Sequence, residues 1–197
     1  NQKTLTNSSL REDLDDESGD NYDYALNYNK TFNNEDQTLS LIASFSQSDE
    51  LEIESFEEEF FDANGVLTPE RLRQNTPVYD EDTKLLLQGD YTQKVLGKLK
   101  FETGYRITIA DKTSDYERNE FDFSKNQFIK NDTFSNVFKY DEDVYAGYAL
   151  VSSKQGKIEY SLGLRAEQAY TTGNLEDQRF TILEVLPFKN NYFKLYP

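Results

Sequence analysis

The chain of 197 residues carries a formal net charge of −16 and contains neither cysteine nor histidine. These two absences exclude disulfides, thiol catalysis, imidazole-based triads and the usual zinc or iron sites. The acidic excess argues against a nucleic-acid-binding surface, because neutralising phosphates requires clustered lysine and arginine. No run of about 18 apolar residues is present, which excludes a transmembrane helix.

The two ends of the chain indicate a segment of a longer protein. The sequence starts at Asn1 without a methionine or a signal-like segment, and it stops at Pro197 inside an alternating run. Residues 1–20 are polar, with an acidic stretch at 12–17. We expect a flexible acidic lead-in over 1–20.

Alternation begins after residue 20. Apolar side chains occupy every second position over 22–28 and again over 39–45, which is the period of a β-strand. Two asparagines and two acids separate the runs, and they predict a tight turn at 33–36.

Residues 47–83 break the alternation and form the first of two long excursions. They contain the Asn64-Gly65 turn dipeptide and the pair Thr68-Pro69. Threonine as N-cap with proline at the first helical position predicts one short helix there.

The third and fourth strands are predicted at 84–94 and 99–109, with a tight turn at 95–98. The second of these is the most regular, since Leu99 to Ile109 alternate with polar residues at every step. No helix favours a period of two held over this length.

The second long excursion covers 111–142 and is rich in Asp, Asn, Lys and Phe. A fifth strand is predicted at 144–152 and a sixth at 158–167, joined by a tight turn at 153–156. Two further strands are predicted near the end of the chain, at 180–188 and 192–196.

The connections follow a rule, because short turns alternate with excursions of about 30–35 residues, which are long for a compact domain. All short connections therefore lie at one end of the sheet and all long ones at the other, as in outer-membrane barrels. Predicted strands of roughly 9–13 residues are also long enough to span a membrane. The sequence predicts an all-β fold: an antiparallel up-and-down meander of about 6–8 long strands over 21–197, part of an outer-membrane-type β-barrel. A soluble β-sandwich also has alternating strands and is the alternative.

Several blocks resemble the barrels of TonB-dependent receptors. The block 138–148, FKYDEDVYAGY, followed by 163–167, GLRAE, is similar to a consecutive strand pair of that family. The blocks 89–92 with 99–106, 36–46 and 193–197 resemble neighbouring hairpins. The resemblance covers roughly 21–197 and includes neither the plug domain nor the energy-coupling box of the family, and 174–191 match poorly.

The resemblance implies a barrel segment in the cell outer membrane of a Gram-negative bacterium, within a receptor that imports a scarce ligand. It implies as partners the outer-membrane lipid and a TonB-type energy-coupling complex, reached through a preceding region. We expect no nucleic acid partner, no cofactor and no enzymatic activity, and the ligand is unknown. The isolated segment is expected to fold over or to self-associate through open sheet edges. A soluble β-rich binding or adhesion module of the cell surface is the alternative function.

Three groups of residues are candidate sites. The acidic stretch 13–20 could hold calcium, but Ser18 and Tyr24 stand where an EF-hand loop requires glycine and glutamate, so a solvated run is favoured. The acids 57–59 and 141–143 could serve glycoside hydrolysis, but nothing separates their pKa values, so no catalytic residue and no metal ligand is assigned. Loop aromatics could contact a ligand, although packing between loops is favoured. These aromatics are Phe56, Phe60, Phe61, Phe121, Phe123, Phe128 and Phe134.

Overall fold

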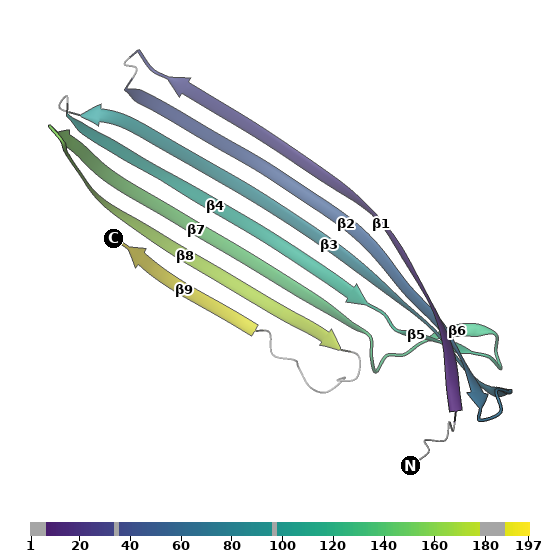
Figure 1. The fold of residues 1–197 in the computed structure, drawn as a ribbon. Coiled ribbons are helices and arrows are strands. Elements are labelled where there is room, and N and C mark those ends of the chain that lie inside the picture. Colours follow the sequence, from purple (N-terminus) through teal and green to yellow (C-terminus); the bar gives the residue numbers. More distant parts are fainter. Residues whose placement is uncertain (1–6, 34–35, 96–97, 178–187) are drawn as a thin grey trace.

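The computed structural model describes residues 7–33, 36–95, 98–177 and 188–197 of the chain. The regular structure of these residues is entirely β-strand (Figure 1). The strands are β1 (Asn7–Thr31), β2 (Gln37–Asp62), β3 (Leu67–Val95), β4 (Leu99–Tyr116), β5 (Asn119–Asp122), β6 (Gln127–Lys130), β7 (Asn136–Gln155), β8 (Ile158–Asp177) and β9 (Phe188–Tyr196). Within the described ranges no helix is long and apolar enough to cross a membrane.

All nine strands belong to one antiparallel sheet, with the main path β1-β2-β3-β4-β7-β8-β9. Strands that follow one another along this path lie side by side, so the predicted up-and-down meander is confirmed (Figure 1). The short strands β5 and β6 form a hairpin that pairs with β3 near its beginning. The β7–β8 turn lies at one end of the sheet, and the β2–β3 turn and the β5–β6 hairpin lie at the other, which we call the distal end.

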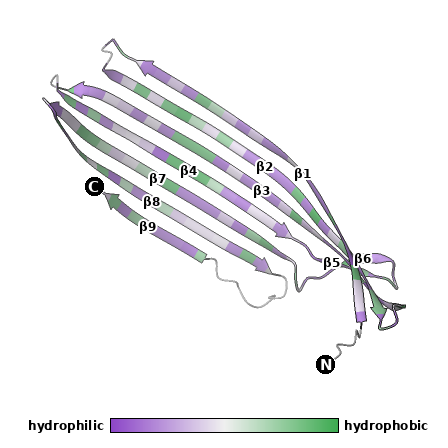
Figure 2. Cartoon of the chain, viewed as in Figure 1, coloured by the Kyte–Doolittle hydropathy of each residue, from purple (hydrophilic) through white to green (hydrophobic). Residues whose placement is uncertain are grey.

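The strands have one apolar face because paired residues of an antiparallel sheet point to the same side. One row of partners across five strands consists of Leu26, Ala43, Leu87, Ile107 and Tyr145. Neighbouring rows on this face are also apolar, and Figure 2 shows the apolar positions recurring along the strands. The apolar band comprises alternate residues within 22–28, 39–45, 85–91, 99–109, 145–151 and 160–166.

The opposite face is polar over the same height of the sheet. The adjacent row on this face contains Asn27, Gln88, Arg106, Glu167 and Lys194 among its partners. Within the described residues no second layer covers either face, and Ala169 is the one buried hydrophobic side chain. Residues of the apolar band remain exposed, with Leu26 at 71% and Leu162 at 81%. This sheet therefore has no protein core of its own.

Two tyrosines cover two glycines, one on each face. On the apolar face the Tyr105 ring lies over Gly89, where an added Cβ would come within 2.6 Å of the ring. On the polar face the Tyr148 ring lies over Gly104, and its hydroxyl donates a hydrogen bond of 2.8 Å to Asp90. Glycine at these positions permits an aromatic ring to lie flat across the neighbouring strand.

Residues 7–20 form the first part of β1 instead of the predicted flexible lead-in. They pair in continuous register with 49–62 of β2. Backbone pairing does not require an apolar face, so an acidic strand can extend an existing ladder. Residues 1–6 lie outside the described part of the chain.

The long excursions are also mostly strand. Residues 47–83 form a hairpin, in which the β2 and β3 ladder continues to Glu59 and Arg71. The predicted helix at Thr68 is wrong, because Pro69 lies where the register shifts, a position that needs no backbone N–H. Within 111–142, β4 continues to Tyr116, β5 and β6 follow, and β7 begins at Asn136.

The predicted turns are nearly correct. Those at 33–36 and 95–98 fall between strands, although 34–35 and 96–97 are outside the described residues. The turn predicted at 153–156 is shifted, because Gln155 still pairs with Ile158 and only Gly156 and Lys157 connect them. Gly156 has a φ of 63°, and a glycine with positive φ at the first central position is typical of a two-residue hairpin turn. The strand predicted at 192–196 is part of β9, and the one at 180–188 lies almost wholly outside the described residues.

Candidate functional site at the distal end of the sheet

Three phenylalanines form a ring cluster on the β5–β6 hairpin. Phe121 contacts Phe123 and Phe128 edge to face, with ring centroids 5.0 Å apart in each pair. Phe121 and Phe128 are cross-strand partners, which brings their rings together. The cluster gives this short hairpin an apolar side, since a hairpin of four-residue strands has little other means of stabilisation.

Two arginines of β3 attach this hairpin to the main sheet. The Arg71 guanidinium lies 4.9 Å from the centre of the Phe123 ring, and that of Arg73 lies 4.9 Å from the centre of the Phe121 ring. Arg73 also donates two hydrogen bonds, of 3.0 and 2.6 Å, to one carboxylate oxygen of Glu57. A guanidinium can stack and donate at once, because its ring-facing surface and its N–H edge are perpendicular.

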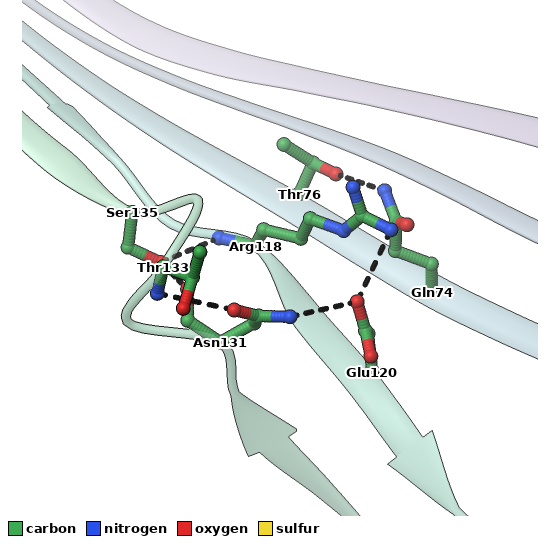
Figure 3. A network of polar contacts seen from close by, with 7 residues as sticks. All are labelled: Gln74, Thr76, Arg118, Glu120, Asn131, Thr133 and Ser135. Atoms are coloured by element: carbon green, nitrogen blue, oxygen red, sulfur yellow. Dashed lines mark hydrogen bonds and ion pairs between the residues drawn. The ribbon is translucent and has the colours of Figure 1, made fainter. Parts of the chain in front are cut away.

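A polar network fixes the chain before and after the hairpin (Figure 3). The amide of Asn131 donates to Glu120 (2.9 Å) and its carbonyl oxygen accepts from the Thr133 backbone (3.1 Å). The hydroxyl of Ser135, which is only 2% exposed, accepts a hydrogen bond of 3.0 Å from the Arg118 backbone N–H. The same hydroxyl donates a hydrogen bond of 2.9 Å to the backbone carbonyl of Asn131. The 117–118 and 131–135 connections are therefore held together by these side chains and by one backbone hydrogen bond, from Asn131 to Arg118 at 2.7 Å.

Aspartates cap the two distal turns. Asp62 accepts hydrogen bonds of 2.9 Å from the backbones of Asn64 and Val66, which lowers its pKa. Asp122 caps the β5–β6 turn, and its pKa is lowered to about 2, first by the side chains of Ser124 and Lys125 and then by their backbone N–H groups. The backbone contacts of both aspartates are of the kind that aspartate commonly forms in turns.

The polar face of the distal end carries carboxylates directly opposite one another. Asp15 is paired with Glu54, and Glu17 with Glu52. Partial desolvation, followed by the charges of Asp15 and Glu54, raises the pKa of Glu52. Opposed like charges cost stability in a sheet, so this arrangement is not explained by folding alone.

The apolar face has its own acidic border, immediately beyond the apolar band. Asp111 is the direct partner of Asp141 on this face. Loss of hydration, the charge of Asp111 and a hydrogen bond to Asp111 all raise the pKa of Asp141. The border marks where an apolar environment for this face ends.

The acidic residues that were considered for metal binding or catalysis are dispersed in the structure. Asp13, Asp15 and Glu17 lie on one face of β1, whereas Glu12 and Asp16 lie on the other, so they cannot converge on one ion. In the described ranges no group of three or more acidic residues is placed to hold a metal. Glu57 is paired with Arg73, and Glu142 lies on the opposite face from Asp141.

The loop aromatics are divided among several contacts. Phe121, Phe123 and Phe128 form the ring cluster, while Phe56 stacks under Arg11 (3.8 Å) and Phe134 under Arg118 (4.6 Å). Phe60 and Phe61 lie on β2 outside the cluster. The arginines were not predicted, although Arg71 and Arg73 have the same spacing as Phe121 and Phe123, which could have indicated a paired stack.

A single antiparallel sheet of long strands, apolar on one face and polar on the other, is the construction of a membrane-spanning barrel wall. The chain matches the outer membrane protein beta-barrel family over residues 30–197 and belongs to that family. It is accordingly a protein of the outer membrane.

Among solved structures, the chain is similar to the crystal structure of the ferric citrate transporter FecA in the unliganded form. The identity is 13% and the TM-score 0.42, and the match covers 81% of this chain. The chain spans 24% of that protein's length. A search of the curated proteins gave no match.

Proposed function

We propose that this chain forms part of the wall of an outer-membrane receptor that imports a scarce ligand, with the distal end facing outward. The observation that carries the proposal is the contrast between the two ends of the sheet. One end has tight turns, and the other has strands that continue beyond the apolar band into a built structure of stacked arginines and phenylalanines. In bacterial barrels the long connections are extracellular, where ligands are captured.

The proposal includes energy coupling by a TonB-type complex through a region outside this chain, and it excludes catalysis as the main role. Binding suits the distal end because its aromatic and charged groups are already engaged with one another. A preorganised surface loses less conformational entropy when a ligand binds. The competing role of a soluble adhesion module is disfavoured by the uncovered apolar band, which a soluble protein would bury.

Single tryptophans test the assignment of the two faces, because the chain contains no tryptophan. Leu87→Trp lies on the apolar face, and Gln88→Trp is the matched control on the polar face. In the whole barrel protein in vesicles, brominated lipid should quench Leu87→Trp strongly and Gln88→Trp weakly. Equal quenching, or a whole protein that is soluble and monomeric without detergent, would contradict the membrane-spanning wall.

Uptake tests the transport role. Replacing 119–130 with a short glycine-serine linker should abolish ligand uptake by cells while the barrel still assembles in the outer membrane. Loss of the energy-coupling complex should have the same effect with the unmodified barrel. Normal uptake after both changes would refute the proposal.

A further inference from the structure

The polar face has a hollow just beyond the height of the apolar band. Its volume is about 290 Å³, and β1, β2, β3, β4 and β7 contribute to its lining. These five strands lie consecutively along the sheet (Figure 1). The volume is at the lower end of the range for small-molecule sites.

Side-chain size creates the hollow. Lys84 has Ser46 as its partner on one side and Ala110 on the other. Serine and alanine form a low floor, while the longer Lys84 and the ring of Tyr140 form walls. On the face of a sheet, a hollow of this kind forms only where short side chains lie beside long ones.

Lys84 and Lys112, the two lysines that line the hollow, differ in whether an acidic side chain pairs with them. Lys112 forms ion pairs with Asp80 (3.4 Å) and Asp82 (3.3 Å), so its charge is compensated. The Lys84 side chain forms no hydrogen bond or ion pair with any residue that the structure describes. On the same row, Asp23 and Glu142 are each two strands away from Lys84, which is about 10 Å at the usual strand spacing.

We propose that this hollow binds a small organic carboxylate. Lys84 supplies the ion pair to the carboxylate, and the hydroxyls of Ser46 and Ser48 donate hydrogen bonds to it. Ala110 and the Tyr140 ring accommodate the apolar body of the ligand. The inference rests on the proposed function, because a carboxylate reaches this face only if the face lines a water-filled lumen.

The acidic distal end does not prevent this binding. Screening limits the repulsion between exposed charges to about 8 Å at physiological salt, and the acidic lining residue Asp82 forms an ion pair with Lys112, which it shares with Asp80. The same acids would disfavour large polyanions, which contact several strands at once. The hollow therefore selects small ligands with one or two carboxylates.

Ligand-observed NMR with the whole barrel protein in detergent micelles tests the proposal, with benzoate as probe and benzamide as its uncharged counterpart. Benzoate should bind at least about tenfold more tightly than benzamide, because a charge-assisted hydrogen bond is stronger than a neutral one. Lys84→Gln should abolish this preference, and Lys84→Arg should restore most of it. Ala110→Leu should fill the floor and weaken both probes. Lys154→Gln, at the short-turn end of β7, is the matched control and should change nothing.

Three results would overturn the proposal: equal binding of benzoate and benzamide, unchanged benzoate affinity in Lys84→Gln, or the same loss in the Lys154→Gln control. Heat-modifiable migration of each variant shows whether its barrel is folded. Ligand uptake in cells is measured separately. In the unmodified barrel, equal binding of benzoate and benzamide together with normal uptake overturns only the hollow, whereas preferential benzoate binding without any uptake overturns only the transport role.

Discussion

Arginine is the residue that organises the distal end. Arg11, Arg71, Arg73 and Arg118 each stack on a phenylalanine ring. Lysine cannot replace them fully, because an ammonium group lacks the planar surface that stacks and the fork of N–H donors. These contacts join residues far apart in the sequence, so no local pattern predicts them.

Arg73→Lys should loosen the attachment of the β5–β6 hairpin to β3. The change removes a guanidinium stack on Phe121 and two hydrogen bonds to Glu57, and we expect a cost of about 1 kcal/mol. Hydrogen exchange of the amides of β5 should become severalfold faster. Lys125→Arg, at the exposed turn of the same hairpin, is the control. Unchanged exchange in Arg73→Lys would show that the stack does not hold the hairpin.

Asp141→Asn should stabilise the protein at neutral pH. The pKa of Asp141 is raised in the folded state, which means that folding favours its protonated form. This contribution to the stability of the fold is fully present below the unfolded pKa of about 3.9, and it is lost as the pH rises through the folded pKa. Asparagine mimics the protonated form, and because Asp141 is exposed and solvent screens its charge, we expect a gain of only about 0.5 kcal/mol at pH 7 that shrinks toward pH 4. Urea unfolding in lipid vesicles measures it. Asp16→Asn is the control, because Asp16 is paired with Ile53. An equal gain at both pH values would contradict a charge origin.

At the scale of elements, alternation predicted where strands cross the membrane but not where they end. Within 99–109 a clear apolar face is required by lipid, so the period of two is visible. In 47–62 both faces of β2 carry acids, for example Glu52 and Asp49, and the apolar signal disappears while the backbone ladder continues. The backbone ladder depends on which two strands pair and how far, and the residue pattern of one strand does not show this.

Gly104→Ala should weaken the β3–β4–β7 contact within the barrel wall. A Cβ at this position would lie 2.6 Å from the Gly89 carbonyl oxygen and 2.6 Å from the Tyr148 ring. Backbone cannot move aside cheaply, so we expect a loss of about 1–3 kcal/mol. Tyr148→Phe, which removes only the hydrogen bond to Asp90, should cost about 1 kcal/mol. Urea unfolding of both variants provides the comparison, and Gly104→Ala matching the parent would mean that the ring does not pack on the glycine.

For the whole molecule, the sequence predicted the barrel wall but not its distal site. The apolar face of the sheet needs an apolar residue at every second position, and this pattern is visible in the sequence of each single strand. The ring cluster and the network around Asn131 depend on where β5 and β6 meet β3, and that geometry is set by chain contacts beyond local patterns. The same holds for the hollow at Lys84, which exists because small residues of two other strands adjoin it.

The edges of the sheet determine how the isolated chain behaves. In the described residues β1 and β9 are the outermost strands of the path, and each has one neighbour. Unpaired strand edges and an uncovered apolar face both promote association.

We therefore predict that the isolated 197-residue chain self-associates in mild detergent, as measured by light scattering after correction for detergent mass. Leu26→Lys, on the apolar face of β1, should reduce the association, because it places a charge on the uncovered apolar face through which copies would associate. Asn27→Lys is the matched control, since it points to the polar face, and it should have little effect. A monomeric mass without binding of an apolar dye would instead mean that the sheet covers its own edges by folding over.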